Sequence, residues 1–207
     1  MTLIEHTVTF GTFSLDGGTW DVDNNVWLVA DAAECLLIDA PHDAVPIREL
    51  IGARTLRAIV CTHAHDDHIT AARELAEEFG APVLLHPADE VLWRQVYPDF
   101  DYTPLTDGDE LTVAGVTVTV LHTPGHSPGA VCLYAPELST AFTGDTLFAG
   151  GPGATGRSYS DFGTIIDSIR DRLLALPPET TVRTGHGDST TIGTEAPQLA
   201  DWIARGH

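Results

Sequence analysis

Short apolar runs recur along most of the chain, and polar or glycine-containing stretches separate them. This pattern predicts β-strands. The first ten residues alternate between apolar and polar side chains, as do the Val and Thr residues beyond the turn signal Asp107–Asp109. Such alternation is typical of strands with one buried face. We expect strands at residues 1–10, 26–30, 35–39, 56–61, 82–86, 116–121, 130–134 and 140–143.

Apolar residues three or four positions apart predict helices between these strands. One helix is expected over 69–79 and ends at Gly80, and another begins with a capping-box-like pair, Thr164 and Asp167. Strands followed by helices, twice along the chain, predict two sheets packed face to face with helices outside. Further helices are expected over 43–51 and 88–96, and a last short helix is expected to bury Leu199, Trp202 and Ile203.

Composition indicates one globular domain that spans residues 1–207. A chain of this length with 43% hydrophobic residues can bury roughly 70% of its unfolded surface. No apolar run reaches the roughly 18 residues that cross a bilayer. The N-terminus lacks the basic flank of a signal peptide. We therefore expect a cytoplasmic protein with no membrane partner.

The net charge and the cysteine content limit which classes of partner and which cysteine states we expect. The net charge of −20 argues against nucleic-acid binding, because phosphate backbones are bound by Lys and Arg. Cys35, Cys61 and Cys132 lie in apolar runs without close spacing, which predicts buried free thiols rather than disulfides. We expect a small molecule as the partner, and the sequence carries no signal for a particular oligomeric state.

The segment that follows the predicted strand 56–61 is rich in metal-binding side chains. His63, His65, Asp67 and His68 offer imidazole and carboxylate donors, which divalent transition metals bind. A solvated, histidine-rich loop is the alternative explanation. Because this pattern arises by chance in roughly one such chain in 500, we favour a metal site.

Further donors appear later in the chain in a similar setting. His126, Asp145 and His186 each lie just beyond a strand-like run and beside glycine. Loops at the ends of strands are where functional side chains gather. The repetition predicts a single site at one end of a sheet.

Together these motifs resemble the metallo-β-lactamase fold hydrolases, and most closely their short glyoxalase II-like branch. The resemblance extends from Asn24 to Ile192. It implies an α/β (α+β) fold, a four-layer αββα sandwich, with a metal centre at one edge between the sheets. The motifs that carry it are His63-Ala64-His65-Asp66-Asp67-His68, Thr123-Pro124-Gly125-His126-Ser127-Pro128-Gly129, Phe142-Thr143-Gly144-Asp145-Thr146-Leu147-Phe148, Gly156-Arg157 and Gly185-His186-Gly187.

The resemblance also implies how two divalent metal ions are held. Zinc is the expected metal, with iron and manganese as alternatives, since all three accept imidazole and carboxylate ligands. Asp67 and Asp145 would be catalytic because they help to hold the hydroxide that acts as the nucleophile. His63, His65 and His126 would hold one ion, Asp67, His68 and His186 the second, and Asp145 would bridge the two.

Such a site suits the hydrolysis of a thioester. Metal ions lower the pKa of bound water toward 7, so its hydroxide can attack a carbonyl carbon without a separate general base. A thiolate, with a pKa of about 8.5, then leaves without a strong acid, whereas a β-lactam nitrogen needs protonation. We expect a glyoxalase II-like thioesterase that cleaves an acyl-thiol conjugate of a small thiol carrier, such as a lactoyl- or formyl-thiol.

Other functions remain open on the sequence alone. A persulfide dioxygenase resembles the same branch but uses one iron, whose ligands would be His63, His126 and Asp145. A lactonase needs the same hydroxide. A metal-binding scaffold without catalysis is a third alternative, although such a scaffold usually lacks one of the ligands.

Several remaining residues are assigned smaller roles. Arg157 and Tyr159 are expected near the substrate. The glycine-rich segment 151–158 has the spacing of a phosphate loop, but no helix follows it directly, so we do not expect nucleotide binding. Asp39 is expected to orient a ligand histidine. His6, His42, His86 and His207 are expected to be surface or satisfied polar groups, and His122 lies at a strand end near the site.

Overall fold

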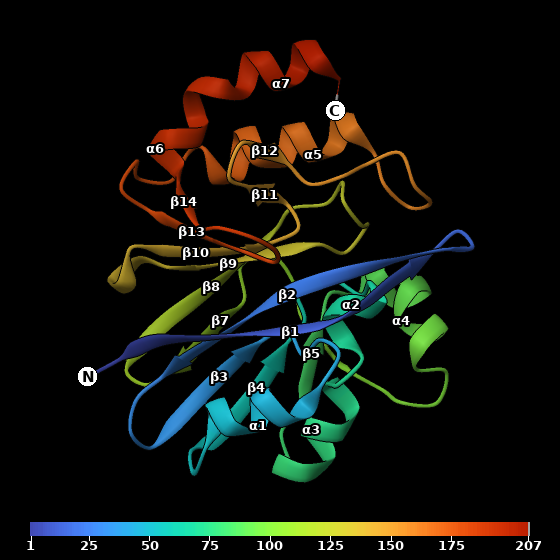
Figure 1. Cartoon of the computed structure of the whole chain (residues 1–207). Coiled ribbons are helices and arrows are strands. Elements are labelled where there is room, and N and C mark those ends of the chain that lie inside the picture. The colour runs from blue at the N-terminus through green and yellow to red at the C-terminus, as the bar shows by residue number, and fades with distance from the viewer. Residues whose placement is uncertain (207) are drawn as a thin grey trace.

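Two six-stranded sheets pack against each other between outer helices, in a computed structural model that describes residues 1–206 (Figure 1). The predicted two-sheet architecture is therefore confirmed. In the first sheet β1, β2 and β3 pair antiparallel, whereas β3 to β6 pair parallel. Its strands, in spatial order, are β1 (Leu3–Leu15), β2 (Gly18–Ala30), β3 (Glu34–Ile38), β4 (Thr55–Val60), β5 (Val83–Leu85) and β6 (Thr103–Pro104).

The second sheet is antiparallel except for the parallel pair β10 and β13. A separate two-stranded ribbon, β11 (Leu147–Phe148) with β12 (Gly151–Pro152), lies between β10 and β13 in the chain. The strands of the second sheet, in spatial order, are β14 (Thr190–Thr191), β13 (Thr181–Thr184), β10 (Thr140–Gly144), β9 (Val131–Ala135), β8 (Val116–His122) and β7 (Glu110–Val113).

The helices form the two outer layers. Figure 1 shows α1 and α3 beneath the first sheet, and α5 and α7 beyond the second. The α-helices are α1 (Ala44–Ile51), α2 (Asp66–Ile69), α3 (Ala72–Phe79), α4 (Glu90–Val96), α5 (Phe162–Ser168), α6 (Ile192–Glu195) and α7 (Leu199–Arg205), with short 3₁₀ segments at Pro87–Asp89, Pro136–Leu138 and Ala196–Gln198 and a π-helical turn at Ile169–Leu173.

Three apolar clusters hold the four layers together. Ile59 of β4 packs with Leu75 of α3 in the cluster under the first sheet. The next residue, Val60, points to the opposite face, as alternate strand residues do, and joins Phe142 between the sheets. Trp202 belongs to the third cluster, which lies under the outer helices of the second sheet. The sequence thus forms a core between each pair of layers.

A long hairpin at the N-terminus extends beyond the strands that the sequence predicts. β1 and β2 pair in register from Leu3 opposite Ala30 to Leu15 opposite Gly18. The two turn residues between them, Asp16 and Gly17, have φ angles of 53° and 79°. Asp-Gly at two such positions is a strong hairpin signal, which explains why the strands continue to the turn.

Three helix predictions need correction. The helix expected over 69–79 is interrupted, because the Ala71 amide donates to Ala40 O (2.9 Å) and so leaves the helical ladder. α5 begins at Phe162 rather than at Thr164, since the Asp161 carboxylate caps it by accepting from Thr164 N (2.7 Å). Ile203 was expected to be buried, but it is 52% exposed, and Trp202 alone is the buried residue of α7.

The cysteines and the helices can be compared with two further expectations. Cys35, Cys61 and Cys132 are buried and unpaired, as predicted. Within residues 1–206, none of the helices combines the length and apolar character that spanning a bilayer requires. The parallel strand pairs direct the ends of β3 and β4, and of β10 and β13, toward one edge of the sandwich, where the predicted donors follow.

Candidate metal centre

Three buried imidazoles form the first group of donors. His63 and His65 follow β4, and His126 comes from the loop after β8. His63 Nε2 and His126 Nε2 each lie 3.0 Å from His65 Nδ1. The structure thus brings together the three side chains predicted to hold one ion.

The second group contains one carboxylate and two imidazoles. Asp67 and His68 lie in the short helix α2, and His186 follows β13. His186 Nε2 lies 3.3 Å from both Asp67 Oδ2 and His68 Nε2. These are the residues predicted to hold the second ion.

Asp145 lies between the two groups. Its Oδ2 is 3.5 Å from His126 Nε2 and 3.4 Å from His186 Nε2, and its Oδ1 is 3.3 Å from His68 Nε2. Gly185 makes this approach feasible, because a Cβ there would overlap the Asp145 carboxylate and the His68 ring. One carboxylate therefore reaches donors of both groups, as a bridging ligand must.

The donor set fits divalent ions. Nitrogen ligands about 2.1 Å from a tetrahedral ion lie about 3.4 Å apart, which is close to the observed 3.0–3.5 Å separations. Asp145 Oδ1 is a buried oxygen with no hydrogen-bond donor among the described residues. Buried polar atoms are rarely left so, and a cation would satisfy this one.

The two groups differ in charge. Burial lowers the pKa of His63 well below its ordinary value, and burial together with His126 lowers the pKa of His65 to about 3, so these rings stay neutral and offer lone pairs. Burial opposes the charged form of His68 too, but Asp145 and Asp67 outweigh it and raise its pKa well above its ordinary range. Carboxylates likewise raise the pKa of His186 to about 10. The second group is therefore the more anionic environment.

Hydrogen bonds donated by the outward ring nitrogens fix the orientation of three ligand histidines. Asp39 Oδ2 lies 2.9 Å from His68 Nδ1, which confirms the role expected for Asp39. His126 Nδ1 lies 2.8 Å from Ala154 O, and His186 Nδ1 lies 2.7 Å from the backbone oxygen of Asp23. Such contacts select the ring tautomer that leaves the inner nitrogen free to bind metal.

A buried carboxylate that the sequence analysis missed holds two ligand loops together. Asp89 is fully buried and accepts from Ala64 N (2.9 Å), from Ser127 Oγ (2.8 Å) and from Gly129 N. Ala64 lies between two ligand histidines, and Ser127 follows His126 in the chain. The sequence shows only that Asp89 follows a predicted strand. Its burial and its hydrogen-bond partners depend on tertiary contacts and cannot be predicted from the local pattern.

The other described histidines are satisfied polar groups, as expected, and one of them, His42, also lies next to the metal centre. His6 stacks on Trp27, and His86 stacks on His122 with ring centroids 4.0 Å apart. His42 contacts Asn24, which itself contacts ligand atoms, so His42 belongs to the surroundings of the centre. His207 lies outside the described residues.

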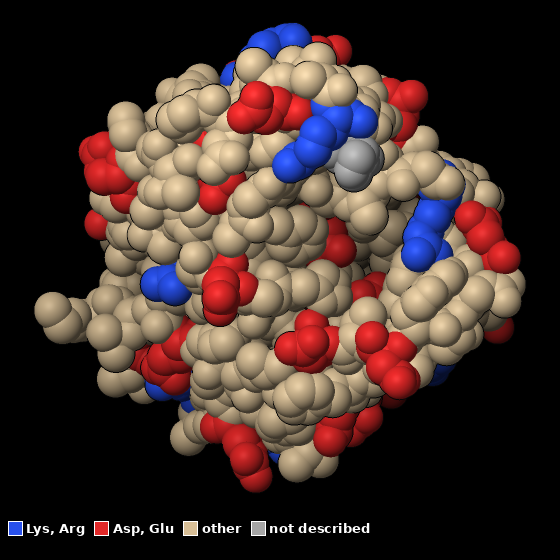
Figure 2. All heavy atoms as spheres, turned by 45° about the horizontal axis from the view of Figure 1, so that its top comes forward, with Lys and Arg blue, Asp and Glu red and all other residues tan. Residues whose placement is uncertain are grey.

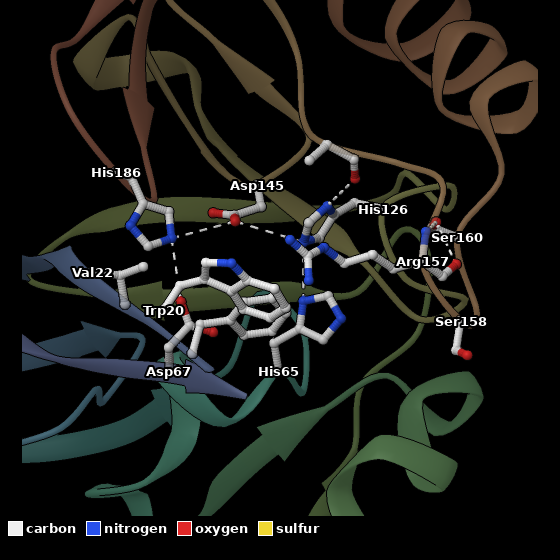
Figure 3. A pocket seen from close by; sticks show the side chains of 12 residues that line it. Trp20, Val22, His65, Asp67, His126, Asp145, Arg157, Ser158, Ser160 and His186 are labelled. Atoms are coloured by element: carbon white, nitrogen blue, oxygen red, sulfur yellow. Dashed lines mark hydrogen bonds and ion pairs between the residues drawn. The ribbon is translucent and has the colours of Figure 1, made fainter. Parts of the chain in front are cut away.

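A pocket of about 250 Å³ opens over the donors (Figure 3). The hairpin contributes Phe13, Trp20 and Val22 to its wall, and the segment after the β12 strand contributes Arg157. The Arg157 guanidinium lies 3.8 Å above the Trp20 ring, while Tyr159 is 48% exposed and outside the lining. The pocket is lined by Phe13, Trp20, Val22, His65, Asp67, His126, Asp145, Ala154, Arg157, Ser158, Ser160 and His186.

Comparison with known proteins identifies the family. The sequence profile described as the metallo-beta-lactamase superfamily matches residues 19–186. The chain belongs to the metallo-β-lactamase superfamily. The resemblance seen in the sequence is therefore confirmed, and the two-sheet fold is that of the superfamily. The protein is a member of a metallo-hydrolase superfamily that carries a cluster of His and Asp donors.

Three superfamily members illustrate the similarity. Hydroxyacylglutathione hydrolase GloC of Haemophilus influenzae is 36% identical over an alignment of 190 positions that covers 85% of this chain and 86% of that protein. TTHA1623, solved in a di-iron-bound form, is 36% identical with a TM-score of 0.76, covering 84% of this chain and 93% of that one. ETHE1 from Myxococcus xanthus is 28% identical with a TM-score of 0.74, covering 93% and 85%.

The substitution Asp89→Asn should lower the free energy of unfolding of the metal-free protein by about 2–4 kcal/mol. Asparagine has no charge, and its amide NH₂ would face N–H or O–H groups that now donate to Asp89. Urea unfolding followed by circular dichroism measures this change. Asp188→Asn, at an exposed position, should change it by less than about 0.5 kcal/mol. Equal stability of the two variants would contradict the role given to Asp89.

Proposed function

We propose that this protein is a metal-dependent thioesterase that hydrolyses an acyl-thiol conjugate of a small thiol carrier. The observation that carries the proposal is the convergence of the His and Asp donors at the base of a small pocket. The similarity to a hydroxyacylglutathione hydrolase supports the choice of a thioester.

Two divalent ions, with zinc as the first choice, would be held by the two groups and bridged by Asp145. When bound, such ions supply a hydroxide near neutral pH and polarise a carbonyl oxygen. Asp67 and Asp145 would orient this nucleophile from within the ligand set. The di-iron form of TTHA1623 supports iron as an alternative metal.

The pocket wall favours a good leaving group. Among the described lining residues, the side chains outside the ligand set are apolar ones, two serines and Arg157. None of them is an acid that could protonate a departing amine near neutral pH. A thiolate with a pKa of about 8.5 needs no such acid, so the wall supports a thioester rather than a β-lactam.

A persulfide dioxygenase is the second candidate. The three ligands it would use lie together, since the ring centroids of His63 and His126 are 4.9 Å apart and Asp145 Oδ2 lies 3.5 Å from His126 Nε2. A single iron could therefore occupy the centre. A lactonase would use the same residues as the thioesterase.

We further propose a cytoplasmic protein whose partner is a small molecule and not a nucleic acid or a membrane. The buried free cysteines support a reducing compartment. Figure 2 shows acidic side chains scattered over one face, with fewer basic ones, in keeping with the net charge of −20. Such a surface repels phosphate backbones.

The zinc-loaded protein should hydrolyse thioesters of small thiols with a kcat/KM at least about tenfold above that for lactones and β-lactams. Removing the metal with a chelator should abolish the activity, and adding zinc back should restore it. A panel of substrates, tested on protein of known metal content, measures this. One iron per chain together with persulfide-dependent oxygen uptake would favour the dioxygenase instead.

Asp145→Ala should lose both ions, because Asp145 reaches both groups, whereas His186→Ala should lose chiefly the second. Metal analysis after dialysis should give about zero and about one ion per chain respectively. Equal retention in the two variants would contradict a bridging Asp145.

Arg157 and Tyr159 are proposed to contact the substrate carrier. The Arg157 guanidinium lies over the Trp20 ring, and its positive charge faces the pocket. Arg157→Gln should therefore raise KM for thioesters of anionic thiols by about tenfold with kcat nearly unchanged. Tyr159→Phe removes only the hydroxyl of an exposed side chain and should raise KM by about twofold. Steady-state kinetics with anionic and neutral carriers test this, and unchanged KM values in both variants would refute it.

A further inference from the structure

A buried amide lies among the donors of the second group. Asn24 is on β2 and fully buried. Its Nδ2 lies 3.1 Å from Asp67 Oδ2, 3.2 Å from His68 Nε2 and 3.4 Å from His186 Nε2. These three atoms belong to the residues of one donor group, so the amide lies directly against the donors of the second ion.

The other end of the amide is held by His42. His42 Nε2 lies 2.7 Å from Asn24 Oδ1. The backbone of His42 has a φ of 50°, and its N–H donates to Thr70 Oγ1 (2.9 Å). Gly11 on β1 gives the ring its space, because a Cβ there would overlap it. The rare backbone conformation and the glycine neighbour together leave the His42 ring little freedom to move.

Hydrogen-bond chemistry decides which way the amide points. An ionised carboxylate only accepts, so the Asn24 atom beside Asp67 Oδ2 must be the nitrogen. The Asn24 oxygen then faces His42, and His42 must donate from Nε2. Burial lowers the pKa of His42, so the ring is neutral near pH 7 and can carry its proton at Nε2.

We propose that His42 and Asn24 form a positioning pair that sets the affinity for the second metal ion. His42 orients the amide, and the amide N–H holds Asp67 Oδ2 in line with His68 and His186. Asp67 needs this support because it lies on α2, a helix of only four residues. The inference rests on the two-ion centre of the proposed function and assigns a role to residues outside the ligand set.

Stepwise titration of the metal-free protein with Zn²⁺, in competition with a chromophoric chelator, tests the inference. Asn24→Leu keeps a similar volume and removes the amide. It should raise the Kd of the second ion by about 10- to 100-fold and leave that of the first within about threefold. Thermal unfolding of each metal-free variant separates this effect from general destabilisation.

The His42 variants test the orientation independently of Asn24. His42→Leu should weaken the second ion by about tenfold. His42→Gln should stay within about threefold of the unsubstituted protein, because a glutamine amide can donate from a similar position. His86→Leu is the matched control, since His86 is also partly buried with a lowered pKa but stacks on His122 away from the ligands. It should leave both affinities unchanged.

Several results would overturn the inference. Asn24→Leu that binds the second ion normally, or that weakens both ions equally, would refute selective positioning. His42→Gln as weak as His42→Leu would refute donation from Nε2. In these cases an unsubstituted protein that still binds two ions leaves the proposed function intact. An unsubstituted protein that binds fewer than two would instead refute the two-ion centre, and the inference with it.

Discussion

The structure depends on keeping many donors close together in a buried space. Asp67 and Asp145 are both buried carboxylates. Each lies beside the imidazoles of His68 and His186 rather than in water. Burying charge without compensation is costly, and these carboxylates raise the pKa values of His68 and His186 against the opposing effect of burial. The three apolar clusters of the fold therefore have to keep these buried polar groups in place.

That rigidity comes from elements far from the donors in sequence. β3 and β4 are parallel, as are β10 and β13, so their ends deliver loops to one edge. Each loop is then fixed by a polar group behind it. Asp39 supports His68, and Asp89 connects the loops that carry His63, His65 and His126. The ligands are thus held by a second set of buried polar side chains.

The sequence predicts the strands, the layers and the donors because these depend on local pattern. Apolar runs mark the strands, and the spacing of His63 to His68 is itself diagnostic. What it misses depends on tertiary contacts. The break before α3 arises from the bond between Ala71 and the distant Ala40. Likewise Asn24 and His42 are adjacent only after β2 and the loop beyond β3 come together, and nothing local to either residue indicates this.

The pocket wall comes from other segments of the chain than the metal ligands beneath it. Its apolar side comes from the tip half of the β1–β2 hairpin, and its far side from the segment around Arg157. Ser158 N donates to the Asp16 carboxylate (Oδ2, 2.9 Å), and the Arg157 guanidinium stacks on the Trp20 ring, so the two segments contact each other. Neither segment contributes a predicted ligand. Changes in these rims can therefore alter which molecule fits the pocket without displacing any residue of the donor set.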